Sequence, residues 1–137
     1  MQNNLSQKEI VLFYEFLNCY ESNLKQLKND KSLGKISNEF KSKLKQFQIK
    51  INVVNKGKFP SSTYLISNEI FMTLSKNSQM LSFLNHLRNS IAHCLIKRVG
   101  HKYHISDNYR GILTMNGIIN EQYLKDLINL FIDNFKI

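Results

Sequence analysis

The sequence contains little of what makes a chain turn sharply, form disulfides or enter a membrane. One proline and five glycines in 137 residues favour long uninterrupted elements over many tight turns. Two cysteines cannot make a disulfide framework. No apolar run reaches membrane-spanning length, and the polar N-terminus lacks the hydrophobic region of a signal peptide. We therefore expect a single cytoplasmic domain over residues 1–137, with no membrane segment.

Acidic side chains are also few. The chain has 19 Lys+Arg against 10 Asp+Glu, a formal net charge of +9. This excess suits a polyanionic partner, for which RNA or DNA is the natural candidate. A solvated lysine-rich surface explains the charge equally well, because the basic residues are spread along the chain and form no tail.

The apolar residues recur at helical spacing over most of the chain. Ser6, with Glu9 three residues later, forms a capping box ahead of the first apolar seam. Asn77 or Ser78 can cap the long fourth helix, which Gly100 ends, and Asn120 can cap the last helix. The five helices are expected over residues 6–30, 36–51, 61–76, 78–98 and 120–135.

The period changes between the last two helices. Residues 102–106 and 111–115 indicate two short strands around Asp107-Asn108. The sequence therefore predicts an all-α fold. It would be an up-and-down bundle of four to five helices, with a small β-hairpin before the C-terminal helix.

The fourth helix carries the residues best suited to chemistry. Counting about 100° per residue places His86, Asn89 and His93 on one stripe away from the apolar seam. Asn89 and His93 can touch, whereas Arg88 lies roughly 140° from His93 and does not face it. A site that uses both would need a second copy of the chain, which predicts a homodimer paired through the fourth helix. Cys94 is expected inside the seam, so a cysteine nucleophile is not predicted.

The run Leu87-Arg88-Asn89-Ser90-Ile91-Ala92-His93, late on a long helix and followed by a β-like segment and a closing helix, resembles the signature of HEPN domains of toxin and antiphage-defence loci. The resemblance implies a metal-independent endoribonuclease with no cofactor. His93 would be the general acid or base for attack of a ribose 2′-hydroxyl on the adjacent phosphate. Arg88 would hold that phosphate, and Asn89 would orient His93 or contact phosphate. The products would be a 2′,3′-cyclic phosphate and a 5′-hydroxyl.

Further basic residues around the motif are candidates for RNA contact. In some HEPN toxins, the antitoxin modifies a tyrosine that lies two residues after the histidine. This chain has Leu95 at that position, so that form of regulation is not expected. A cognate antitoxin or a defence-complex protein remains a predicted partner. His101 and His104 have metal-site spacing but no acidic or cysteine cluster beside them, so a metal is not predicted. The predicted RNA-binding residues are His86, Lys97, Arg98, His101 and Lys102.

Other functions fit the same residues. His93 can be an ordinary surface histidine, and Arg88 an ordinary salt-bridging arginine. A HEPN domain can also keep its motif and serve only to bind nucleic acid or a nucleotide, or to dimerise. A helical interaction protein without affinity for nucleic acid is a third alternative. RNA cleavage, RNA binding without cleavage, and salt-insensitive or absent RNA binding distinguish the three.

Overall fold

The computed structural model describes residues 4–29, 33–61 and 65–135. Within these ranges the strands form one five-stranded sheet in the order β1-β2-β5-β4-β3. β1 and β2 are parallel, and the other neighbours are antiparallel. The elements are α1 (Gln7–Ser22), α2 (Leu24–Asn29), α3 (Leu33–Gln46), β1 (Lys50–Val53), β2 (Glu69–Met72), α4 (Gln79–Ala92), β3 (Ile96–Val99), β4 (Lys102–Tyr109), β5 (Ile112–Asn120) and α5 (Glu121–Phe135). The fold is α/β, and the prediction of an all-α bundle is wrong.

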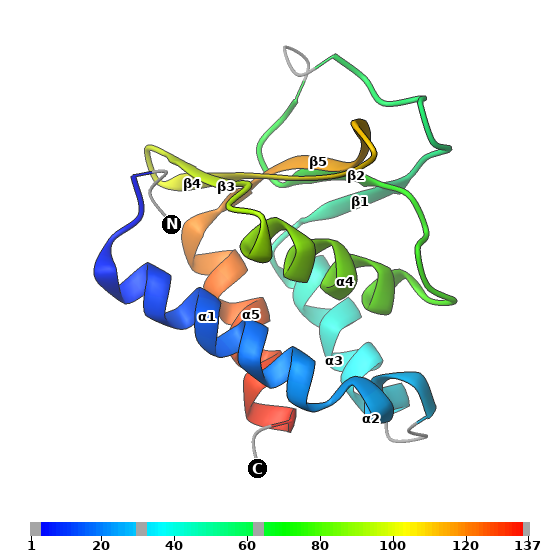
Figure 1. Cartoon of the computed structure of the whole chain (residues 1–137), viewed down its shortest axis with the longest axis vertical. Coiled ribbons are helices and arrows are strands. Elements are labelled where there is room, and N and C mark those ends of the chain that lie inside the picture. Colours follow the sequence, from blue (N-terminus) through cyan, green and yellow to red (C-terminus); the bar gives the residue numbers. More distant parts are fainter. Residues whose placement is uncertain (1–3, 30–32, 62–64, 136–137) are drawn as a thin grey trace.

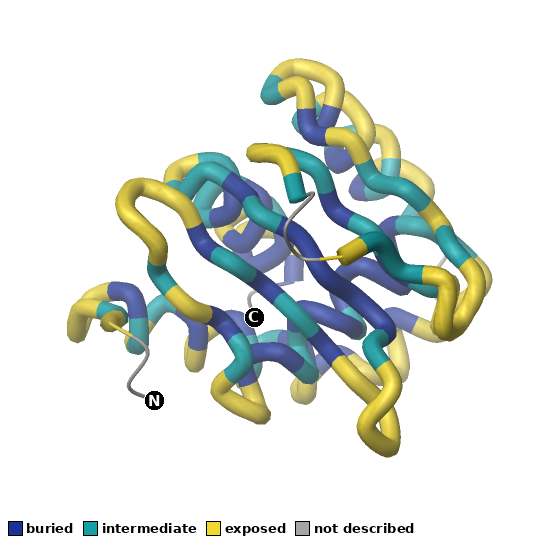
Figure 2. Tube along the Cα trace, turned by 90° about the horizontal axis from the view of Figure 1, so that it is seen from above, coloured by how far each residue is buried: buried dark blue, intermediate teal, exposed yellow. Residues whose placement is uncertain are grey.

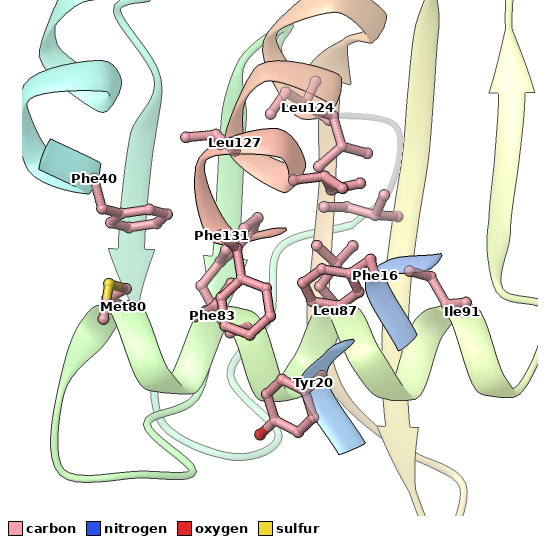
Figure 3. Packing of buried hydrophobic residues seen from close by; sticks show 14 of the residues in the cluster. Phe16, Tyr20, Phe40, Met80, Phe83, Leu87, Ile91, Leu124, Leu127 and Phe131 are labelled. Atoms are coloured by element: carbon pink, nitrogen blue, oxygen red, sulfur yellow. The ribbon is translucent and has the colours of Figure 1, made fainter. Parts of the chain in front are cut away.

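The helices lie on one side of the sheet, and the connection between β1 and β2 lies on the other (Figure 1). The core forms between the helices and the inner face of the sheet, where α4 faces aromatic and aliphatic residues of α1, α3 and α5 (Figure 3). The α4 residues Phe83, Leu87 and Ile91 are fully buried there. Seen from above, the central strands alternate between buried and intermediate positions, and the turns are exposed (Figure 2). The sheet therefore has an inner face that packs against the helices. No helix of the described residues covers its outer face.

The predicted third helix is replaced by β2. Ile70 and Met72 are buried, whereas Glu69 and Phe71 between them are only partly so, which is the period of two of a strand. Part of the predicted helix, residues 62–64, lies outside the described residues. The apolar spacing of this segment also fitted a helix. It forms a strand instead, because pairing with β1 and β5 satisfies its backbone hydrogen-bonding groups.

The fourth helix is shorter than predicted. Ser78 caps α4 as expected, but the helix ends at Ala92 instead of Arg98. Cys94 adopts φ +57°, and Leu95 N–H donates to the Ser90 carbonyl at 2.7 Å. This Schellman turn reverses the chain into β3, so the predicted last helical turn is a strand. Cys94 is exposed, not in the apolar seam. Gly100 belongs to the β3–β4 turn rather than to a helix end.

Several local predictions are confirmed. The Ser6–Glu9 capping box is present on α1, and Asn120 Oδ1 accepts from the Gln122 N–H at 2.9 Å at the start of α5. The predicted first helix breaks at Asn23 into α1 and α2, and its predicted end at Asp30 lies outside the described residues. The second predicted helix gives way to β1 before residue 51. The hairpin exists, but its strands are longer and its turn lies at residues 110–111, so Asp107 belongs to β4.

Gly117 marks the closest approach between strands. A Cβ atom built there would lie 2.8 Å from Ile70 Cα and 2.9 Å from the Glu69 carbonyl oxygen. Because both contacts are with backbone atoms, no side-chain rearrangement relieves them. Glycine at this position therefore lets β2 pair tightly with β5.

Candidate functional site

His93 occupies the C-terminal end of α4. The residue is the helix C-cap, with φ −102° and ψ 11°, and it is exposed. Across residues 4–29, 33–61 and 65–135, its side chain has no hydrogen-bond or ion-pair partner. The Schellman turn holds the backbone, so the imidazole is presented to solvent on a defined helix end. An exposed imidazole without a partner can contact a ligand through either ring nitrogen.

Arg88 lies about one and a half turns earlier on the same helix. Its Nε donates to Glu21 Oε1 of α1 at 2.5 Å, and its Nη1 donates to Asn89 Oδ1 at 3.0 Å. The Arg88 side chain is 32% exposed. These contacts fix the guanidinium at the surface and leave Nη2 without a partner in the described part of the chain. No interaction joins Arg88 to His93 within that part, in line with the register argument.

Asn89 connects Arg88 to a buried polar pair. Asn89 Nδ2 donates to Asp107 Oδ2 at 3.2 Å, and the same oxygen lies 2.9 Å from His86 Nδ1. His86 Nε2 lies 2.8 Å from the Thr73 carbonyl oxygen, which can only accept, so Nε2 carries a proton. His86 Nδ1 and Asp107 Oδ2 are hydrogen-bonded to each other. Asn89 is thus oriented by Asp107, not by His93.

The position of His86 differs from the register prediction. The residue is 2% exposed, so it does not lie on a free stripe beside His93 and is not available as a surface RNA contact. Asp107 comes from the inner face of β4, two residues after the buried Ile105. Its Oδ1 has no hydrogen-bond partner among the described residues. The helical wheel could not reveal this pair, because the strand that supplies the carboxylate was predicted to turn at Asp107.

Arg98 also faces inward, although it was predicted to contact RNA. Its Nη1 donates to Glu9 Oε2 at 2.7 Å and to Glu121 Oε2 at 2.6 Å. Tyr103 donates its hydroxyl to the same Glu9 oxygen. The guanidinium is therefore neutralised between α1 and α5 and ties both helices to β3. Nothing in the sequence pattern of any single element indicated this cluster.

The Glu9 carboxyl has an unusually low pKa. Burial alone would raise it, but the Ser6 backbone N–H, the Tyr103 hydroxyl and nearby Arg98 favour the ionised form and lower the pKa to about 2. Burial, reinforced by the adjacent Glu9 carboxylate, raises the pKa of Tyr103 above its usual range. The cluster is thus a partly buried ion pair to which the Tyr103 phenol is hydrogen-bonded, and it ties α1 and α5 to the β3–β4 hairpin.

The remaining predicted RNA contacts gather on the β3–β4 hairpin. Lys97 and Lys102 are exposed, and His101 lies in the turn between the strands with its side chain 90% exposed. Lys97 is opposite His104, and Lys102 is opposite Val99. Side chains of such opposed pairs point to the same face of a sheet. Lys97, Lys102 and His104 therefore share the outer face, and His101 stands at its rim.

An open hollow of about 730 Å³ lies on this part of the outer face. Val99 and Ile118 line it from the sheet, and Leu65 and Ser67 line it from the connection that precedes β2. Lys102 Nζ donates to Ser67 Oγ, and His104 Nε2 lies 2.6 Å from Asn116 Oδ1. The hollow thus combines aliphatic walls with oriented basic side chains.

No group of three or more His, Cys, Asp or Glu residues suited to a metal occurs in the described ranges. Nor does any helix in them combine the length and apolarity needed to cross a bilayer.

Searches against family models, curated proteins and solved structures find no match. The HEPN resemblance therefore remains a prediction from the residues that carry it.

Proposed function

We propose that the protein is a metal-independent endoribonuclease whose site combines Arg88 of one copy with His93 of a second copy. The observation that carries this proposal is the exposed end of α4. There, a histidine without a partner among the described residues follows an arginine whose guanidinium is held at the surface. Within one chain these two groups are not joined. A twofold arrangement of α4 is the simplest way to bring them together.

The surface beside α4 supports pairing of two copies. α1 contacts α4, and Glu21 of α1 holds Arg88. The exposed residues Val11 and Tyr14 are 55% and 39% accessible and lie one helical turn apart on α1. Glu21 lies seven residues after Tyr14, on the same side of the helix. An apolar strip next to the motif is a suitable contact for a second copy, because a twofold interface uses the same patch twice.

The chemistry follows from the two side chains. The 2′-oxygen of a ribose forms a bond to the adjacent phosphorus while its proton passes to the His93 imidazole. The bond from phosphorus to the 5′-oxygen breaks, and that oxygen takes a proton from water. Arg88 stabilises the negative charge that develops on the phosphoryl oxygens through Nη2. Asn89 keeps the guanidinium in place. The products are a 2′,3′-cyclic phosphate and a 5′-hydroxyl, and no redox partner is needed.

End-labelled single-stranded RNA incubated in EDTA tests this proposal. Loss of the general base typically costs 10²–10⁴-fold, so we expect His93→Ala to lower cleavage by about that factor. Lys45→Ala, which changes an exposed lysine on α3 away from the motif, is the matched control and should cleave like the wild type. Circular dichroism confirms that each variant folds. Wild-type protein that binds RNA without shortening it refutes cleavage and favours a binding module.

Mixed dimers test the shared site directly. Arg88→Ala and His93→Ala are each expected to be inactive, but a dimer that contains one of each retains one intact Arg88–His93 pair. After co-expression, half of the randomly paired dimers are mixed and half of their sites are intact, so about a quarter of the wild-type activity should return. No recovery, although mass measurement shows mixed dimers, contradicts the shared site. A protein that is a monomer at assay concentration contradicts it as well.

A further inference from the structure

The hollow on the outer face of the sheet has the features of a ligand site that the cleavage chemistry does not use. Its volume of about 730 Å³ is within the roughly 300–1,000 Å³ typical of small-molecule sites. Its walls come from two separate segments, the β3–β4 hairpin and the residues leading into β2. The described helices pack on the opposite side of the sheet (Figure 1). The connection between β1 and β2 lies on the side of the hollow, but Val99 and Lys102 are exposed there, so a ligand can reach them from solvent.

The side chains of the hollow divide into an apolar and a basic part. Leu65, Val99 and Ile118 supply aliphatic surface, and 58% of Val99 is accessible although the residue is apolar. Aliphatic side chains of this kind suit the flat face of a heterocyclic base. Lys102 and His104 supply the polar part. The sequence singled out Lys102 for its charge, but only the fold places it beside these apolar groups.

The basic side chains are held in place by neighbours. Ser67 Oγ accepts one hydrogen bond from Lys102 Nζ and leaves two ammonium N–H groups for a ligand. Asn116 Oδ1 receives the His104 Nε2–H, which leaves Nδ1 of the ring for a second contact. The acidic residue near the hollow is Glu69, which lies opposite Ile118 across the β2–β5 pair. Glu121 accepts a hydrogen bond from Arg98. The hollow is thus more basic than acidic, and the free N–H groups of Lys102 are its oriented donors.

The hollow is connected to the exposed end of α4 by a short edge strand. β3 begins four residues after Ala92, and its outward residues are Lys97 and then Val99 at the hollow. Four strand residues cover roughly 10 Å, a distance that a few nucleotides of extended RNA can bridge. Because α4 and the hollow lie on opposite sides of the sheet, RNA that occupies both would have to pass around the edge strand β3, where Lys97 is exposed.

We propose that this hollow binds one unpaired nucleotide of single-stranded RNA. The base lies against Leu65, Val99 and Ile118, and Lys102 holds the phosphate. A base inside a duplex cannot enter the hollow, so the site selects single-stranded segments. The proposal rests on the proposed function for its substrate class, and it adds a recognition subsite away from the cleaved bond.

Calorimetric titration of His93→Ala protein with each of the four ribonucleoside 5′-monophosphates tests the subsite without interference from cleavage. Loss of a hydrogen-bonded charge typically costs enough to weaken binding about tenfold or more, which is the effect expected for Lys102→Ala in this background. Val99→Asp, at the exposed edge, should weaken binding similarly because it places a carboxylate beside the base. Lys45→Ala in the same background is the control and should bind like its parent.

The outcomes separate the two proposals. Nucleotide binding that depends on Lys102 and Val99, together with wild-type protein that never cleaves RNA, supports the subsite and refutes the ribonuclease. The subsite alone is refuted if the wild-type protein cleaves RNA but binds no nucleotide detectably. It is also refuted if neither Lys102→Ala nor Val99→Asp changes nucleotide binding. Inorganic phosphate that competes as well as a nucleotide shows that the base contributes nothing, which also overturns the subsite.

Discussion

Glu9 offers a direct test of the contacts that hold the β3–β4 hairpin against the helices. The carboxylate is 4% exposed and joins α1 to Arg98 of β3 and Tyr103 of β4. Replacing it in Glu9→Gln removes the charge but keeps a side chain that can still complete the capping box with Ser6. The substitution therefore isolates the ion pair and the phenol hydrogen bond from the helix cap.

The low pKa sets the size of the effect. Each pKa unit is worth about 1.4 kcal/mol, so a carboxyl lowered from 4.5 to about 2 contributes about 3 kcal/mol to the free energy of unfolding at neutral pH. Because the folded-state pKa is lower than the unfolded one, this contribution is complete above the unfolded value. It is lost as the pH falls toward the folded value, and about 1 kcal/mol remains at pH 3.

Urea unfolding followed by circular dichroism at pH 7 and at pH 3 measures the contribution. We expect the wild type to exceed Glu9→Gln by about 3 kcal/mol at pH 7 and by about 1 kcal/mol at pH 3. Glu15→Gln, at an exposed position of the same helix, is the control and should change the free energy of unfolding by less than about 0.5 kcal/mol. Equal differences between wild type and Glu9→Gln at both pH values would refute the assignment of the low pKa to this carboxyl.

Two further substitutions test the buried contacts. Asp107→Ala leaves buried His86 and Asn89 without their shared acceptor and should lower the free energy of unfolding by roughly 3–5 kcal/mol in urea titrations. Asp107→Asn should cost less, because its amide can donate to His86 Nδ1 although that group no longer accepts from Asn89, and an equal loss in both variants would contradict the hydrogen-bond account. Gly117→Ala forces a methyl group against the β2 backbone and should destabilise the fold by about 1–3 kcal/mol in thermal unfolding. Gly34→Ala, where a Cβ meets nothing within 4 Å, is its control, and equal stability of the two variants would contradict the close approach.

Local signals in the sequence were reliable where neighbouring residues decide the structure. The Ser6 and Ser78 caps and the Asn120 cap of α5 depend on contacts within a few residues, and all three are confirmed. The hairpin is present too, but its turn lies at residues 110–111 and not around Asp107–Asn108 as predicted. The apolar seam of α4 from Met80 to Ile91 is buried as predicted. The helix predicted over residues 61–76 was wrong because its apolar residues fit the period of a strand as well as that of a helix. The segment forms β2, which pairs with β1 and β5.

The sequence by itself determined the starts of α1, α4 and α5, the buried face of α4 from Met80 to Ile91, the basic charge and the separation of Arg88 from His93 around one helix. Only the tertiary structure decided that α4 ends at Ala92, that His86 is buried against Asp107, and that Arg98 is neutralised while Lys97 and Lys102 stay exposed. The physical reason is the range of the interactions. Caps and periodicity act within one turn or one strand, whereas the partner of a buried charge and the face of a strand are fixed by segments far apart in the chain.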